Sequence, residues 1–141
     1  TDAFKGLAVR TIEAIPAAPD SLWVGTDNGL FVSRDAGKSF TRASQPGMGM
    51  CQGIAVDPKN SSRWFVAVAA PWWTSHKNIP GIYLTVDGGV NYRRLSDMPG
   101  EGMAWRLTLD PHDGNRLYVG TNGIGAWRAV IAENGSPDTA E

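Results

Sequence analysis

The chain has 141 residues, enough to bury the core of about one domain. Its 13 Lys and Arg residues are balanced by 14 Asp and Glu residues without any basic run, so nothing indicates a nucleic-acid partner. The single cysteine, Cys51, excludes an internal disulfide and a cysteine-rich metal site. The longest apolar stretch, residues 64–73, is too short to span a bilayer, so no transmembrane segment is predicted.

Alternation of apolar and polar residues with period 2 predicts short strands along the whole chain. In the first third, we expect them at residues 9–16, 21–26, 30–35 and 39–43. In the middle third, we expect them at residues 52–57, 63–69, 82–85 and 91–95. The last third shows them at residues 105–110, 116–121 and 126–130, with a fourth strand missing or unrecognisable. No stretch has a convincing helical stripe.

The predicted strands contain two repeated phrases. Residues 33–40 and 85–92 both follow the pattern [Ser/Thr]-x-Asp-x-Gly-x-polar-aromatic, and their aspartates lie 52 positions apart. An apolar strand ending in Asp-Pro and followed by an arginine-led strand begins at Ile54 and again at Leu107. A period near 50 predicts three four-stranded antiparallel β-propeller blades at about residues 9–44, 45–97 and 98–131. The tail, residues 132–141, is expected to be flexible.

The eight-residue motif contains the residue types that stabilise the turn of a β-hairpin. Its aspartates are expected to accept hydrogen bonds from backbone N–H groups of the turn, and its glycines to supply the positive φ that the turn requires. Its hydroxyl groups can bond locally, and its aromatic rings are expected to fill the neighbouring hydrophobic layer. None of these roles needs a ligand, so a structural role is predicted for Ser33, Asp35, Gly37, Phe40, Thr85, Asp87, Gly89 and Tyr92.

At these residues the chain resembles the Asp-box (BNR) repeat propellers, which include sialidases, xyloglucan-cleaving glycoside hydrolases, the sortilin ectodomain and photosystem II assembly factors. The resemblance covers most of residues 9–130, and the stretch from Val119 to Arg128 is similar to the closing blade of the xyloglucanase-like or assembly-factor branches. It implies six or more blades, whereas about three are present. We therefore expect an incomplete propeller, which is either the C-terminal part of a larger one or pairs with another chain.

The resemblance also implies that ligands bind on the face that carries the second-to-third-strand loops and the links between blades. The middle unit has an insertion there, residues 70–81, which contains two adjacent tryptophans. These rings either form a stacking platform for a sugar or a partner side chain, or fold back and are buried on their own blade. The candidate binding residues on this face are Trp72, Trp73, His76, Lys77, Glu101 and Trp105.

The same face carries four methionines, which either form a soft patch for a protein partner or pack between blades: Met48, Met50, Met98 and Met103. Glycoside hydrolysis needs two carboxylates around one bond, and the candidates are Glu13, Asp97 and Glu101. Their separation does not follow from the sequence, so no catalytic residue is assigned. No cofactor is expected, and no metal site is predicted because the two histidines lack companions at metal-binding spacing.

Three classes of function remain. The favoured one is a non-catalytic binding or assembly module that uses the tryptophan-rich face to hold a protein or a polysaccharide. The alternatives are a fragment of a xyloglucanase-like glycoside hydrolase and a structural subunit of a larger complex. The expected partners are other propeller blades of the same or another chain, and the expected location is secreted or periplasmic.

Overall fold

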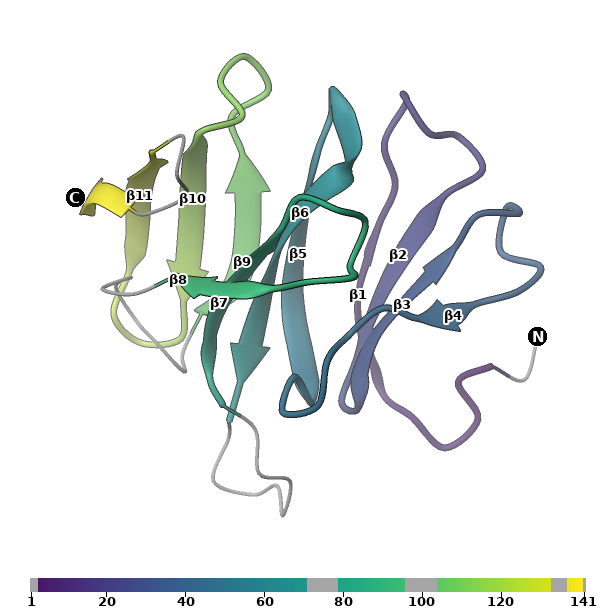
Figure 1. Cartoon of the computed structure of the whole chain (residues 1–141). Helices are drawn as coiled ribbons and strands as arrows, with labels where there is room; N and C mark the ends of the chain where they lie inside the picture. Colours follow the sequence, from purple (N-terminus) through teal and green to yellow (C-terminus); the bar gives the residue numbers. More distant parts are fainter. Residues whose placement is uncertain (1–2, 71–78, 96–103, 133–136, 141) are drawn as a thin grey trace.

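The computed structural model describes residues 3–70, 79–95, 104–132 and 137–140 (Figure 1). The described residues form three four-stranded antiparallel sheets, and this part of the chain contains no helix. In each sheet, which we call a blade, the strands follow one another from one edge to the other in chain order. The all-β prediction is confirmed.

The strands lie where the alternation predicts them, with ends that differ by a few residues. Blade 1 contains β1 (Val9–Glu13), β2 (Leu22–Thr26), β3 (Gly29–Ser33) and β4 (Thr41–Arg42). Blade 2 contains β5 (Met50–Asp57), β6 (Asn60–Ala69), β7 (Gly81–Thr85) and β8 (Arg93–Leu95). Blade 3 contains β9 (Ala104–Leu109), β10 (Arg116–Thr121), β11 (Ala126–Ile131) and β12 (Pro137–Ala140).

The third unit has a fourth strand, which the sequence pattern left as missing or unrecognisable. β12 pairs antiparallel with β11, with Thr139 opposite Val130, and it lies within the tail that was expected to be flexible. Its sequence, Pro-Asp-Thr-Ala, has no apolar alternation, which is why the pattern does not reveal it. An edge strand needs only one hydrogen-bonding neighbour, and proline is tolerated at the start of such a strand.

The first strands of the three blades, β1, β5 and β9, lie side by side, with β5 in contact with both of the others. Two glycines permit a close approach of their backbones. A methyl group added at Gly25 in β2 would lie 2.5 Å from the carbonyl oxygen of Cys51 in β5. One added at Gly53 in β5 would lie 3.0 Å from the carbonyl oxygen of Trp105 in β9. A side chain larger than hydrogen does not fit at Gly25, and at Gly53 it would force the facing backbone to shift.

Blade 2 lies between blades 1 and 3, so both of its faces are covered. Alternate residues of its strands point to opposite faces and therefore enter two separate cores. The core between blades 1 and 2 is centred on Trp23 and Trp64, whose rings meet edge to face at a centroid distance of 5.8 Å. The core between blades 2 and 3 contains Phe65 and Leu117. All four side chains are fully buried.

Antiparallel pairing sorts the connections to two ends of the array (Figure 1). One end, which we call the box end, carries the β1–β2, β5–β6 and β9–β10 turns and the repeated segments 33–40 and 85–92. The opposite end, which we call the link end, carries the β2–β3 and β10–β11 turns and the β4–β5 link, residues 43–49.

We predict that Gly25→Ala lowers the free energy of unfolding by about 2 to 3 kcal/mol, because the added methyl group forces β2 away from β5. The matched control is Gly120→Ala, at the equivalent position of β10, where the nearest atom to an added Cβ is Cβ of Arg106 at 3.4 Å. This control is expected to change the free energy of unfolding by less than about 0.5 kcal/mol. Equal losses for both variants in urea denaturation would contradict the prediction.

Candidate functional site

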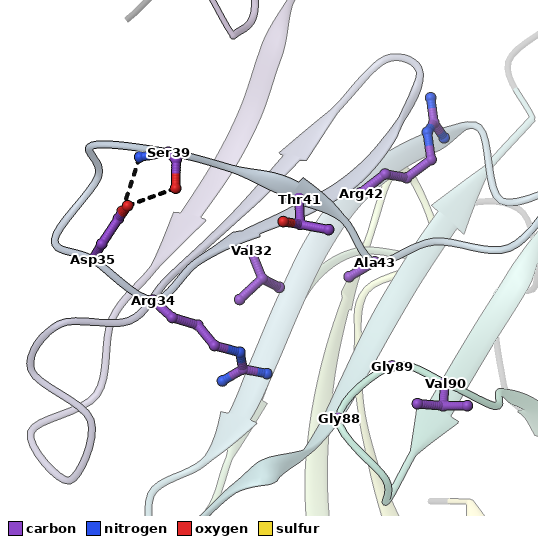
Figure 2. Close-up of a pocket in the computed structure, with 10 residues that line it drawn as sticks. All are labelled: Val32, Arg34, Asp35, Ser39, Thr41, Arg42, Ala43, Gly88, Gly89 and Val90. Atoms are coloured by element: carbon purple, nitrogen blue, oxygen red, sulfur yellow. Dashed lines mark hydrogen bonds between the residues drawn. The ribbon is translucent and has the colours of Figure 1, made fainter.

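The first repeated segment is closed by its own side chains. Oδ1 of Asp35 accepts hydrogen bonds from the hydroxyl group of Ser33 and from the backbone N–H of Ser39, both at 2.8 Å. Oδ2 accepts one from the hydroxyl group of Ser39 at 2.5 Å, and Figure 2 shows both bonds from Ser39. The backbone N–H of Gly37 donates to Oγ of Ser33 at 2.9 Å. Both carboxylate oxygens of Asp35 therefore accept hydrogen bonds from within the turn.

The second repeated segment has the same geometry. Oδ1 of Asp87 accepts hydrogen bonds from the hydroxyl group of Thr85 at 2.8 Å and from the backbone N–H of Asn91 at 3.0 Å. Oδ2 accepts one from the side-chain amide of Asn91 at 2.8 Å, and the backbone N–H of Gly89 donates to Oγ1 of Thr85 at 3.0 Å. Both aspartates thus accept backbone N–H bonds of the turn, as their sequence pattern predicts.

These hydrogen bonds keep both aspartates ionised. The side-chain and backbone bonds from Ser39, with the bond from Ser33, lower the pKa of Asp35 from 3.8 to about 2. The backbone and side-chain bonds from Asn91, with the bond from Thr85, lower the pKa of Asp87 to about 2. A carboxyl group with such a pKa has no proton to donate at neutral pH, so neither aspartate is suited to general acid catalysis.

A groove of about 430 Å³ lies between the first repeated segment and the turn of the second (Figure 2). It is lined by Val32, Arg34, Asp35, Ser39, Thr41, Arg42, Ala43, Gly88, Gly89 and Val90. Asp35 is the one carboxylate among these lining residues, whereas glycoside hydrolysis uses two. The groove therefore lacks the acid pair for that reaction.

The aromatic residues that end the two segments behave differently. The hydroxyl group of Tyr92 accepts a hydrogen bond from Nε1 of Trp64 at 3.1 Å and donates one to the carbonyl oxygen of Ala43 in blade 1 at 2.6 Å. Burial raises the pKa of Tyr92. Phe40 packs edge-on against Phe4 at a centroid distance of 4.8 Å, and Phe4 also contacts Phe31 of β3.

Trp105 is the member of the predicted binding set that the structure describes. Trp72, Trp73, His76, Lys77 and Glu101 lie outside the described residues. The register between β9 and β10 shifts so that Trp105 is the extra residue of a β-bulge at the link end of β9. Trp105 is 36% exposed, more than any other tryptophan that the structure describes.

The same bulge recurs in every blade. The register also shifts between Val9 and Thr11 in β1 and between Cys51 and Gly53 in β5, so Arg10, Gln52 and Trp105 occupy equivalent positions. β-Bulges redirect side chains and are frequent beside binding sites. The sequence does not reveal this bulge, because an arginine, a glutamine and a tryptophan share no chemistry that would mark a repeat.

The β4–β5 link contacts the returning part of the β6–β7 connection. The backbone N–H of Ile79 donates to the carbonyl oxygen of Gly47 at 3.0 Å, and the hydroxyl group of Tyr83 donates to the carbonyl oxygen of Ile79 at 2.8 Å. The two connections therefore share the link end, as expected. Met48 and Met50 are buried, so these two pack between blades rather than form a surface patch. The other two methionines, Met98 and Met103, lie outside the described residues.

The other titratable and metal-binding side chains that the structure describes form no catalytic or metal site. Glu13 is half-buried, and burial raises its pKa, while Asp97, like Glu101, lies outside the described residues. Burial raises the pKa of Cys51 to about 12, so its thiol is unreactive at neutral pH. Within the described ranges, no three His, Cys, Asp or Glu side chains are placed to hold a metal ion. The described residues also lack a helix with the length and apolarity of a membrane span.

Two ion pairs repeat in blades 2 and 3. Arg63 contacts Asp57, and Arg116 contacts Asp110, each with an N–O distance of 3.0 Å. Arg63 also donates to the carbonyl oxygen of Gly114 in blade 3 at 2.6 Å, so it bridges two blades. The sequence-based reasoning missed these pairs, although the spacing of six residues from aspartate to arginine occurs in both repeats and could have revealed them.

No protein-family model matches the chain. It is 30% identical over 127 residues to a probable oligoxyloglucan-reducing end-specific xyloglucanase from Neosartorya fischeri, an alignment that covers 86% of this chain and 14% of that protein. It is 34% identical over 89 residues to xyloglucanase Xgh74A from Acetivibrio thermocellus, which covers 56% of this chain and 10% of that protein. The chain thus spans 14% or less of the length of these relatives.

Solved structures show the same fold. The GH74 xyloglucanase from Xanthomonas campestris aligns with a TM-score of 0.68 at 21% identity, over 86% of this chain and 19% of that one. An auxiliary nutrient binding protein from Bacteroides thetaiotaomicron aligns with a TM-score of 0.68 at 18% identity, over 94% and 31%. YCF48 from Cyanidioschyzon merolae aligns with a TM-score of 0.65 at 16% identity, over 96% and 36%. The described chain has the fold of β-propeller blades.

We predict opposite effects for two substitutions at the fourth position of the repeated segments, where Ala36 has φ 58° and Gly88 has φ 77°. Ala36→Gly is expected to raise the free energy of unfolding by about 1 kcal/mol, because it removes the strain of an L-residue in the left-handed region. Gly88→Ala is expected to lower it by about the same amount. The nearest atom to a Cβ at Gly88 is a guanidinium nitrogen of Arg34 at 3.8 Å, so no clash interferes. Destabilisation by Ala36→Gly in urea would contradict this account.

We predict that the free energy of unfolding falls as the pH drops from about 4 to about 2. In the unfolded chain an aspartate takes up its proton near 3.8, whereas folded Asp35 and Asp87 stay ionised down to about 2. The unfolded state therefore binds more protons in this window, which lowers stability as the pH falls. Urea titrations across this window should show a shallower pH dependence for the Asp35→Asn/Asp87→Asn double variant. An unchanged dependence would show that other groups cause the effect.

Proposed function

We propose that this chain is part of a xyloglucan-active propeller enzyme and that its link end contacts the polysaccharide. The observation that carries the proposal is the 30% identity to a xyloglucanase over 127 residues, which includes 86% of the chain. The alignment of the three blades with part of a GH74 xyloglucanase, at a TM-score of 0.68, is consistent with it. Since xyloglucan is an extracellular polysaccharide, the proposal agrees with the predicted secreted or periplasmic location.

The two ends of the array differ in the side-chain groups that are available to contact a sugar. At the box end, hydrogen bonds within the turns already use the oxygens of Asp35 and Asp87. We propose that the repeated segments are Asp boxes with a purely structural role. At the link end, the exposed part of Trp105 offers an aromatic surface of the kind that packs against the apolar face of a sugar ring.

The β6–β7 connection leaves β6 and returns to β7 at the same end of the molecule. Its return at Ile79 is anchored to the β4–β5 link, which supports a ligand surface built from both connections. We propose that its two tryptophans add stacking surface and that nearby polar side chains orient the sugar. The proposed sugar-contacting residues are Trp72, Trp73, His76, Lys77, Glu101 and Trp105.

The proposed contribution of this chain is substrate binding. Glycoside hydrolysis needs one carboxylic acid and one carboxylate on opposite sides of the scissile bond. The described residues bring no such pair together at the link end. We therefore propose that the catalytic acids lie elsewhere in the enzyme and that these three blades hold the polysaccharide.

A second candidate is the non-catalytic binding or assembly module that the sequence favours. It is supported by the structural likeness to YCF48 over 96% of the chain, because YCF48 has also been solved with a bound D1 peptide. In this case the link end would hold a peptide rather than a sugar, and Trp105 would be an anchor for an apolar side chain.

We predict that Trp105→Ala weakens binding to soluble xyloglucan by about 2 kcal/mol, or about 30-fold in Kd, because a stacking surface is lost. Binding is measured as retardation in native gels that contain xyloglucan. The matched control is Tyr118→Ala, which removes another exposed ring in the middle of β10, away from the bulge. This control is expected to keep the affinity of the unmodified protein.

The Trp72→Ala/Trp73→Ala double variant tests the insertion in the same assay. We expect lost retardation with an unchanged melting temperature, since a ligand platform contributes nothing to the core. A large drop in melting temperature would show that the two rings are buried. No retardation of the unmodified protein by xyloglucan, together with no release of reducing ends, would refute the proposed function and leave the peptide-binding module.

A further inference from the structure

Two turns of the link end carry the same dipeptide in different surroundings. Strands β2 and β10 both end in Val-Gly-Thr, and an Asn-Gly pair follows in the next turn, at Asn28 and at Asn122. In an Asn-Gly pair a backbone amide can attack the asparagine side chain with little hindrance, because glycine has no Cβ beside that amide. The two pairs are therefore chemically alike in the unfolded chain, and the fold decides which of them reacts.

The pair in the β2–β3 turn is held by hydrogen bonds. The backbone N–H of Gly29, whose nitrogen would have to attack, donates to the carbonyl oxygen of Gly49 at 2.5 Å, and Gly29 is buried. The backbone N–H of Asn28 donates to Oγ1 of Thr26 at 3.1 Å, and its carbonyl oxygen accepts a bond from Nη2 of Arg42 at 2.7 Å. Asn28 can therefore react only after these bonds open locally.

The pair in the β10–β11 turn lacks this protection. The hydroxyl group of Thr121 closes the turn by donating to the carbonyl oxygen of Gly125 at 2.6 Å, as Thr26 closes the β2–β3 turn. This turn is longer, so Gly123 lies within the loop rather than at the start of the third strand. Asn122 and Gly123 are exposed. Within the described part of the chain, the backbone N–H of Gly123 and the side chain of Asn122 have no hydrogen-bond partner.

We propose that Asn122 is a site of spontaneous covalent modification, where the folded protein forms isoaspartate, while Asn28 stays intact. The backbone nitrogen of Gly123 loses its proton to solvent and attacks Cγ of Asn122. The new N–Cγ bond closes a succinimide ring, and the Cγ–Nδ2 bond breaks with release of ammonia. Water then opens the ring. Attack at Cγ gives aspartate, and attack at the backbone carbonyl carbon gives isoaspartate, in which the main chain runs through the side-chain carbon.

The modification changes both the charge and the backbone of the link end. Each product places a carboxylate where the native turn has a neutral amide, and isoaspartate also adds a methylene group to the main chain. The added carbon lies inside the loop that Thr121 closes with its two hydrogen bonds to Gly125. No enzyme is required, and the inference does not depend on what the link end binds.

Incubation of the folded chain at mildly alkaline pH, followed by trypsin digestion and mass spectrometry, tests the proposal. Trypsin places Asn28 and Asn122 in separate peptides, residues 11–34 and 117–128, which contain no other asparagine. Conversion raises the mass of a peptide by about 1 Da, and electron-transfer fragmentation distinguishes isoaspartate from aspartate. We expect Asn122 to convert about tenfold or more faster than Asn28, which reacts only while its turn is open. A sample without incubation corrects for conversion during digestion.

Incubation in concentrated urea separates the effect of the fold from that of the local sequence. Both turns are open in the unfolded chain, so we expect the rates at Asn28 and Asn122 to agree within about twofold. Equal rates at the two residues in the folded protein would overturn the proposal. Conversion of Asn122 in urea but not in the folded protein would also overturn it, because the folded turn would then protect this residue.

Asn122→Gln is the matched variant, because a glutamine would have to close a larger ring and reacts far more slowly. The peptide 117–128 of this variant should keep its mass during the incubation, whereas Asn28 should behave as in the unmodified protein. A mass increase in this peptide at the original rate would place the reaction at another residue and overturn the proposal. The further Asn-Gly pair, at Asn134, lies outside the described residues and falls in a different peptide, residues 129–141.

Discussion

The close approach of the first strand of one blade to the blade before it sets the geometry of the array. β5 lies so close to Gly25 that only hydrogen fits there, and β9 lies so close to Gly53 that an added methyl group would force the backbone to shift. Farther along each blade, large rings separate the sheets, with Trp23 against Trp64 and Tyr92 reaching back to Ala43. Trp23 and Gly25 lie in the same strand, so close backbone approach and ring packing alternate along β2, while Tyr92 joins the blades farther from the first strands. The glycines thus determine the propeller-like arrangement as much as the core does.

Away from the first strands, polar bonds connect the blades. Tyr92 donates to the carbonyl oxygen of Ala43, the side chain of Gln45 donates to that of Val90, and Arg63 donates to that of Gly114. Each such bond contributes about 1 kcal/mol net. Their larger effect is on specificity, because each requires one register between adjacent blades, whereas apolar packing alone tolerates small shifts. The repeated turns also favour one register. Their aspartates accept hydrogen bonds from within the turn and so fix the conformation of the segment between the third and fourth strands.

The features that the sequence predicted are those that recur with the same chemistry. The repeated segments were recognisable because Asp35 and Asp87, with their glycines, perform one task in two places, and the strands because alternation accompanies a buried face. The missed features repeat in geometry without repeating in residue type, as at Arg10, Gln52 and Trp105. β12 was missed because an edge strand needs backbone pairing rather than a pattern.

The box end and the link end differ in the same way, because residue types recur at the box end and vary at the link end. At the box end, blades 1 and 2 close the hairpin between their third and fourth strands with the same repeated segment, whose aspartate oxygens all accept hydrogen bonds within the turn. At the link end the connections differ widely: residues 27–28 join β2 to β3, residues 122–125 join β10 to β11, and residues 70–80 join β6 to β7. A connection that is not required to repeat is free to acquire a ligand surface on a fixed scaffold. The regularity that makes the box end easy to recognise is therefore the reason that we place function at the link end.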